Sequence, residues 1–72
     1  MIEKLIKFGK VEQCEVINNE YHILLSTKFD NSAQKTLKLM RLINNEIGKT
    51  YNHVIKMASD KNHFHYILGK KI

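Results

Sequence analysis

One stretch of the chain, residues 30–48, carries a sustained helical repeat, and it constrains the fold more than any other segment. At about 100° per residue, apolar side chains gather on one side of this stretch and lysines on the other. Its apolar side carries Ala33, Thr36, Leu37, Leu39, Met40, Ile43 and Ile47. Residues 30–32, Asp-Asn-Ser, compete as the N-cap, and Gly48 stands where a left-handed residue would end a helix. We therefore predict a helix over about residues 31–47.

The segment before this helix has the pattern of a β-hairpin. Residues 11–27 alternate between apolar and polar side chains around Asn18-Asn19, and asparagine tolerates the positive φ of a type I′ turn. A turn at this position pairs Val16 with Tyr21 and Cys14 with Ile23. Residues 1–10 are ambiguous, because Ile2, Leu5 and Ile6 suit one helical turn whereas Ile6 and Phe8 suit a strand. We favour an edge element that lies against the sheet, with Gly9 permitting a bend.

The segment after the helix predicts a second hairpin, residues 51–70, that turns near residues 60–62. Alternation assigns its side chains to two faces. The face toward the helix is predicted to carry Tyr51, His53, Ile55, Met57, Phe64, Tyr66 and Leu68. The opposite face is predicted to carry Asn52, Val54, Lys56, His63, His65 and Ile67.

These elements predict an α+β fold with the order ββαββ, in one domain spanning residues 1–72. A right-handed crossover through the helix lands one strand away, and the last strand fills the gap that this leaves. The expected sheet is four-stranded and mainly antiparallel, with strand order 1-2-4-3 and the helix on one face.

Charge and composition limit the partners and the compartment. Twelve Lys and Arg residues against seven Asp and Glu give a net charge of +5, which favours anionic partners. Arg41 is the single arginine, so direct reading of DNA bases, which relies on arginine forks, is disfavoured. The lone Cys14 excludes an intrachain disulfide and predicts an intracellular, cytoplasmic setting. No apolar run reaches the ~20 residues of a membrane helix.

Three groups of residues are candidates for function. The basic side of the helix, together with its neighbours, predicts a contact site for a negatively charged protein or nucleic acid, because the apolar Leu42 stands there among cations. This site comprises Lys35, Lys38, Arg41, Leu42, Lys49 and Lys56.

The sheet face away from the helix is predicted to expose Val11, Ile17, Leu24, Val54 and Ile67. Of these, Leu24, Val54 and Ile67 are predicted interface residues, unless residues 1–8 fold over them.

The third candidate is a metal site. His63 and His65 flank Phe64 on one strand and project to one side, which is how a sheet presents two imidazoles to a divalent metal. With strand order 1-2-4-3, His22 lies on the neighbouring strand and the same face. His53 is excluded because alternation places it toward the helix.

Residues 21–68 resemble the histidine-hydrophobic-histidine nuclease domain of rolling-circle replication initiators and related mobilisation nucleases. The resemblance is carried by the segments 21–27, 51–55 and 63–68 around the helix. It implies metal-dependent nicking of single-stranded DNA with His63 and His65 as ligands. The chain departs from the family in two ways: residues 56–58, Lys-Met-Ala, replace an acidic or polar ligand, and no catalytic tyrosine follows the motif.

The expected function is therefore that of a small, basic, non-enzymatic binding protein with no cofactor, which docks on a protein, a nucleoprotein complex or nucleic acid. Its size and its proline-free composition, rich in Lys, Asn and Ile, are typical of inhibitors or adaptors from phages and mobile elements. Two alternatives remain open: a metal-dependent single-stranded DNA nicking domain or its inactive remnant, and a homodimerising structural subunit.

Overall fold

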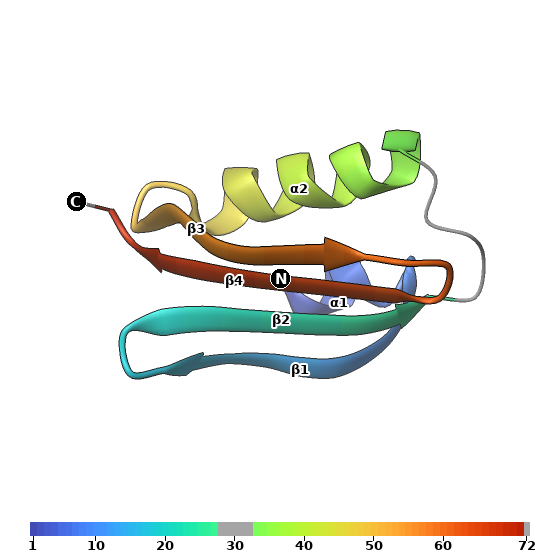
Figure 1. Ribbon diagram of the computed structural model, residues 1–72, viewed down its shortest axis with the longest axis horizontal. Coiled ribbons are helices and arrows are strands. Elements are labelled where there is room, and N and C mark those ends of the chain that lie inside the picture. Colours follow the sequence, from blue (N-terminus) through green and yellow to red (C-terminus); the bar gives the residue numbers. More distant parts are fainter. Residues whose placement is uncertain (28–32, 72) are drawn as a thin grey trace.

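Two hairpins and two helices form one α+β unit, in a computed structural model that describes residues 1–27 and 33–71 (Figure 1). The strands pair antiparallel in the order β1-β2-β4-β3, which confirms the predicted topology. The strands are β1 (Gly9–Ile17), β2 (Glu20–Thr27), β3 (Tyr51–Ser59) and β4 (His63–Lys70). Because β2 and β4 are central, their alternate side chains supply most of the sheet's share of the core, including Ile23, Leu25, Phe64 and Leu68.

The first hairpin follows from its turn chemistry. Asn18 and Asn19 both adopt positive φ, 51° and 65°, as a type I′ turn requires. The predicted pairs Val16–Tyr21 and Cys14–Ile23 are both present. The turn therefore set the register of β1 on β2 from Gln13 to Ile17.

Helix α2 (Ala33–Ile47) matches the predicted range, and its proposed N-cap at residues 30–32 lies outside the described residues. Leu39 and Ile43 are fully buried, as predicted, but Leu37 is 47% exposed. Leu42 was placed on the polar side and instead packs against the edge of the core, because the buried arc is centred nearer residues 39 and 43.

The predicted left-handed conformation of Gly48 is wrong, since Gly9 is the one described glycine with positive φ. A Cβ at Gly48 would lie 2.3 Å from the Asn44 carbonyl oxygen, and this close approach requires glycine.

The N-terminal residues form a short helix, α1 (Ile2–Leu5), rather than the predicted edge element. Its Leu5 is fully buried in the same core as Leu39 and Ile43. An ion pair between Lys4 and Glu46 joins α1 to α2. The residues expected to fold over the outer face of the sheet therefore lie on the helix side.

Three bulges change which side chains face the helices. Pairing is irregular at Asn52 and again at Ile55, so Val54 pairs with Leu68 on the helix side. His53 pairs with Gly69 on the outer side, where Ile55 also lies against Gly69. The predicted faces of residues 53–55 are thus wrong, while those of Met57, Phe64, Tyr66 and Leu68 agree with the pairing.

The bulge in β1, at Glu12, has the same effect on one further residue. Val11 pairs with Leu25 and packs against the core, although it was expected on the outer face. The extra residue reverses the alternation on its N-terminal side. Among the predicted outer residues, Ile17, Leu24 and Ile67 remain outside the core cluster.

Candidate functional site

A hollow with a volume of about 350 Å³ lies between α1 and α2. We call it the helix-layer hollow. It is lined by Lys4, Lys38, Arg41, Leu42, Asn45 and Glu46. Leu42 contributes the apolar part of this lining, because it is half-buried at the flank of α2 that faces α1. The hollow therefore combines one aliphatic contact with several charged groups.

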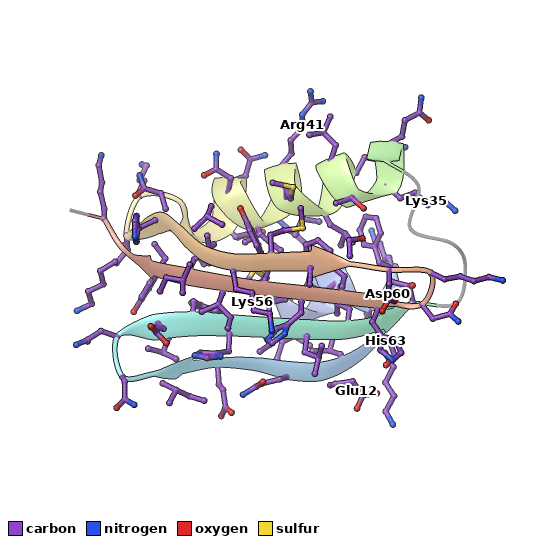
Figure 2. All side chains as sticks on the ribbon, viewed as in Figure 1. Glu12, Lys35, Arg41, Lys56, Asp60 and His63 are labelled. Atoms are coloured by element: carbon purple, nitrogen blue, oxygen red, sulfur yellow. The ribbon has the colours of Figure 1, made fainter. Side chains whose placement is uncertain are left out.

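The charges of the hollow divide into a paired set and an unpaired set. Lys4 and Glu46 form an ion pair, which raises the pKa of the lysine and lowers the pKa of the carboxyl group. No described carboxylate lies within ion-pair distance of Lys38 or Arg41. Figure 2 shows Arg41 projecting from α2 away from the sheet. These two cations are therefore available to an external anionic group.

The structure brings only part of the predicted basic site together. Lys38, Arg41 and Leu42 meet in the hollow, but Lys35 lies half-buried near the start of α2. Lys49 is exposed beyond the end of α2. Lys56 pairs with Ile67 on the outer face of the sheet and lies over the strands in Figure 2. The six predicted residues thus belong to separate surfaces.

Three residues of the hollow were missed in the sequence. Lys4 lines the hollow because α1 docks beside α2. Asn45 and Glu46 line it because α2 is rotated so that Leu42 is half-buried. A helical repeat identifies an apolar stripe but does not say where a second helix will contact its margin. These three residues can therefore be identified only once the packing of α1 against α2 is known.

A second hollow of about 210 Å³ lies on the opposite flank of α2. It is lined by Met40, Arg41, Asn44 and Tyr66. Burial raises the pKa of the Tyr66 phenol, which keeps this group neutral and able to donate a hydrogen bond. Apart from Arg41, this hollow has no charged lining residue.

The outer face of the sheet is organised in cross-strand rows. One row runs Glu15–His22–Ile67–Lys56 across the four strands, and the next runs Gln13–Leu24–His65–Ala58. Leu24 and Ile67 are half-buried and lie outside the core cluster. Both are where the sequence placed them, whereas Val54, the third predicted interface residue, lies on the helix side.

The candidate metal ligands do not form one group. His22 and His65 are diagonal neighbours, and burial together with the charges of Lys56 and His22 lowers the pKa of His65. His63 is two residues along β4, with its Nδ1 3.4 Å from Asp60 Oδ1, while His22 Nε2 lies 3.2 Å from Glu20 Oε1. Within residues 1–27 and 33–71, no three His, Cys, Asp or Glu side chains are placed to hold a metal ion.

No protein-family model matches the chain, and no curated protein or solved structure matches it either. Neither helix of the described residues is long and apolar enough to span a bilayer. The function of the chain is therefore inferred from the geometry and chemistry of its surfaces.

Proposed function

We propose that this chain is a non-enzymatic binding protein whose helix-layer hollow docks an acidic segment of another protein. The observation that carries the proposal is that the apolar Leu42 lines the hollow together with two cations, Lys38 and Arg41, that have no carboxylate partner among the described residues. An adaptor or inhibitor acts by occupying a surface of its partner, so a contact site of this kind is sufficient for it. A partner segment with an acidic and an aliphatic side chain would satisfy both parts of the hollow.

Two features favour a protein over nucleic acid as the occupant. None of the six lining residues is aromatic, so the hollow offers no ring on which a base could stack. Its single arginine leaves little capacity for bidentate contacts to phosphates or base edges.

The proposal predicts charge-dependent binding of a model ligand. A fluorescein-labelled synthetic peptide of alternating Glu and Leu residues should bind the wild-type chain at low salt, as measured by fluorescence anisotropy. Replacing Lys38 and Arg41 together, K38E/R41E, should weaken binding by about tenfold or more, because two attractive contacts become repulsive. Added salt should weaken wild-type binding, since the contacts are exposed and therefore screened.

The matched control carries the same change of net charge elsewhere. Lys61 in the β3–β4 turn and Lys70 at the end of β4 are exposed and lie outside the hollow. The double variant K61E/K70E should bind the peptide within about twofold of the wild type. If both double variants lost the same amount of binding affinity, binding would depend only on the overall charge of the chain, and the proposal would be overturned. Tighter binding of a thymidine oligonucleotide through Lys38 and Arg41 would identify nucleic acid as the occupant and would also overturn it.

A further inference from the structure

The outer face of the sheet has no covering layer among the described residues. Both helices pack on the other face, where Leu5, Leu39 and Ile43 join one core. In Figure 1, neither helix crosses in front of β2 and β4. Leu24 and Ile67 occupy the middle of this uncovered face, and Ile17 and Ile55 are 39% and 46% exposed at its margins. An apolar centre on a sheet face of this kind is typical of an interface.

The two edges of this face differ in net charge, because the single Lys10 on β1 is outnumbered by two glutamates. Glu12 and Glu15 lie on β1 at one edge, and Lys56 lies on β3 at the other edge. Glu12 lies 3.7 Å from Lys10 Nζ and accepts a hydrogen bond from Ser26, but Glu15 and Lys56 belong to none of the ion pairs among the described residues. Glu15 accepts one hydrogen bond, from Gln13 Nε2 at 3.0 Å. The face therefore has an acidic edge and a basic edge, each with an unpaired charge.

Glu15 and Lys56 lie at the same height along the strands. Glu15 pairs with His22, His22 pairs with Ile67, and Ile67 pairs with Lys56. The two charges are therefore the ends of one row that crosses the whole sheet. Three strand spacings of about 4.8 Å separate them, which is too far for a contact within one chain.

We propose that the outer face of the sheet binds the same face of a second copy of this chain, about a twofold axis that runs along the strands. Rotation about such an axis lays β1 of one copy over β3 of the other and keeps each row at its own height. Glu15 of each copy then meets Lys56 of the other copy. The interface contains this ion pair twice.

The charge pattern selects this axis over the perpendicular one. A twofold axis across the strands would lay β1 on β1 of the second copy and would bring Glu12 and Glu15 near their own duplicates. Like charges placed opposite one another destabilise an interface. The strand-parallel axis is therefore the arrangement in which the face complements itself.

The centre of the face is also complementary under this rotation. His22 and Leu24 on β2 are paired with Ile67 and His65 on β4, in a diagonal arrangement. Rotation places Ile67 of one copy over His22 of the other, and Leu24 over His65. Each aliphatic side chain thus covers an imidazole ring of the other copy, and stacked sheets about 10 Å apart leave room for both to interdigitate.

The overall charge of the face argues against a strongly charged partner. Among the described residues, the charged side chains of this face are Lys10, Lys56, Glu12, Glu15 and Glu20, two cations against three anions. This sum of about −1 contrasts with the +5 of the whole chain. A nearly neutral face with one acidic and one basic edge is complementary to a partner face that also has one acidic and one basic edge. A second copy of this chain presents such a face.

The size of the face sets the expected strength of the dimer. Four strands about 4.8 Å apart and about 25 Å long present roughly 500 Å² per copy. A total near 1,000 Å² is at the lower limit for a specific interface, so we expect dissociation in the micromolar range.

The decisive experiment is a charge exchange followed by sedimentation equilibrium between about 5 and 500 µM. The wild type should move with concentration from its 8.5 kDa monomer mass toward twice that value. E15K and K56E should each weaken dimerisation by about tenfold or more, because each places two pairs of like charges in the interface. The double variant E15K/K56E should recover the wild-type mass profile, because it restores both opposite-charge pairs.

Two controls separate the interface from general effects. K49E changes an exposed cation beyond α2 and should leave the mass profile unchanged, whereas Leu24→Lys should give a monomer with a wild-type circular dichroism spectrum. A monomer mass at every wild-type concentration, or a double variant as weak as the single variants, would overturn the proposal. Because Lys38 and Arg41 lie in the helix layer, K38E/R41E tests the hollow separately from this face.

Discussion

At the scale of single residues, His65 is the titratable group most affected by its position. It is half-buried on the outer face of β4, with Lys56 and His22 close enough to influence it. Burial, followed by the charges of Lys56 and His22, lowers the pKa of its imidazole below the ordinary value of 6.5. All three causes disfavour the protonated ring, so His65 stays neutral to lower pH than an unfolded histidine does.

This shift predicts a loss of stability in acid. The unfolded chain binds the proton more tightly than the folded chain, so the free energy of unfolding falls as the pH drops below about 6.5 and levels off below the lowered pKa. Thermal unfolding measured from pH 7.5 to 5 should show this decrease, and His65→Gln should reduce its slope. An unchanged slope in His65→Gln would contradict the prediction.

Tyr21 predicts the opposite dependence of stability on pH, in the alkaline range. Burial, with a contact between its hydroxyl and Cys14 Sγ at 3.8 Å, raises the pKa of the phenol from 10.0 to about 12. The folded chain therefore retains the phenol proton that the unfolded chain loses, and stability should fall as the pH rises above 10 toward 12. Tyr21→Phe should weaken this pH dependence in urea unfolding measured by circular dichroism. The same pH dependence in both chains would exclude Tyr21 as its cause.

At the scale of elements, strand β1 begins at a residue for which the fold requires glycine. Gly9 has a φ of +155°, and a Cβ at this position would lie 2.2 Å from the Ser26 carbonyl oxygen on β2. The Gly9–Thr27 pair starts the β1–β2 ladder, and residues 6–8 connect it to the end of α1. The glycine therefore allows the chain to turn from the helix layer into the sheet.

Gly9→Ala should therefore lower the free energy of unfolding by about 1–3 kcal/mol, through backbone strain and a steric conflict with Ser26. Urea unfolding followed by circular dichroism measures the change. Lys10→Ala, at the exposed next position, should stay within about 0.5 kcal/mol of the wild type. Equal stability of the two variants would show that the entry into β1 tolerates a side chain.

At the scale of the whole molecule, one core joins both helices to the sheet. Leu5 from α1, Leu39 and Ile43 from α2, and Phe64 from β4 are all fully buried in it. A chain of 72 residues has a total stability on the order of a few kcal/mol, because it buries a modest share of its surface. Each of these side chains therefore accounts for a large part of that stability.

Leu5→Ala should destabilise the fold by about 2–5 kcal/mol and leave a substantial unfolded population at 37 °C. Ile6→Ala is the matched control, because Ile6 is adjacent and 57% exposed, and it should cost less than about 0.5 kcal/mol. Differential scanning calorimetry compares the two variants. Similar melting temperatures would mean that α1 does not dock against the core.

Short-range chemistry in the sequence determined much of the fold. Asn18-Asn19 specified a turn and hence the pairs Val16–Tyr21 and Cys14–Ile23, and the apolar repeat placed Leu39 and Ile43 in the core. With the right-handed crossover, these elements led to the observed strand order. Such features are local, because they depend on backbone angles and on the periodicities of helix and strand.

Only the tertiary structure decided the faces of residues 53–55, the burial of Leu5 and the composition of the helix-layer hollow. A bulge inserts a residue where neighbouring strands impose their pairing, so no property of β3 alone predicts Asn52 and Ile55 as the points where alternation breaks. The two flanks of α2 likewise differ because α1 occupies one of them. These outcomes depend on which surfaces compete to be buried, a balance that exists only once distant parts of the chain are in contact.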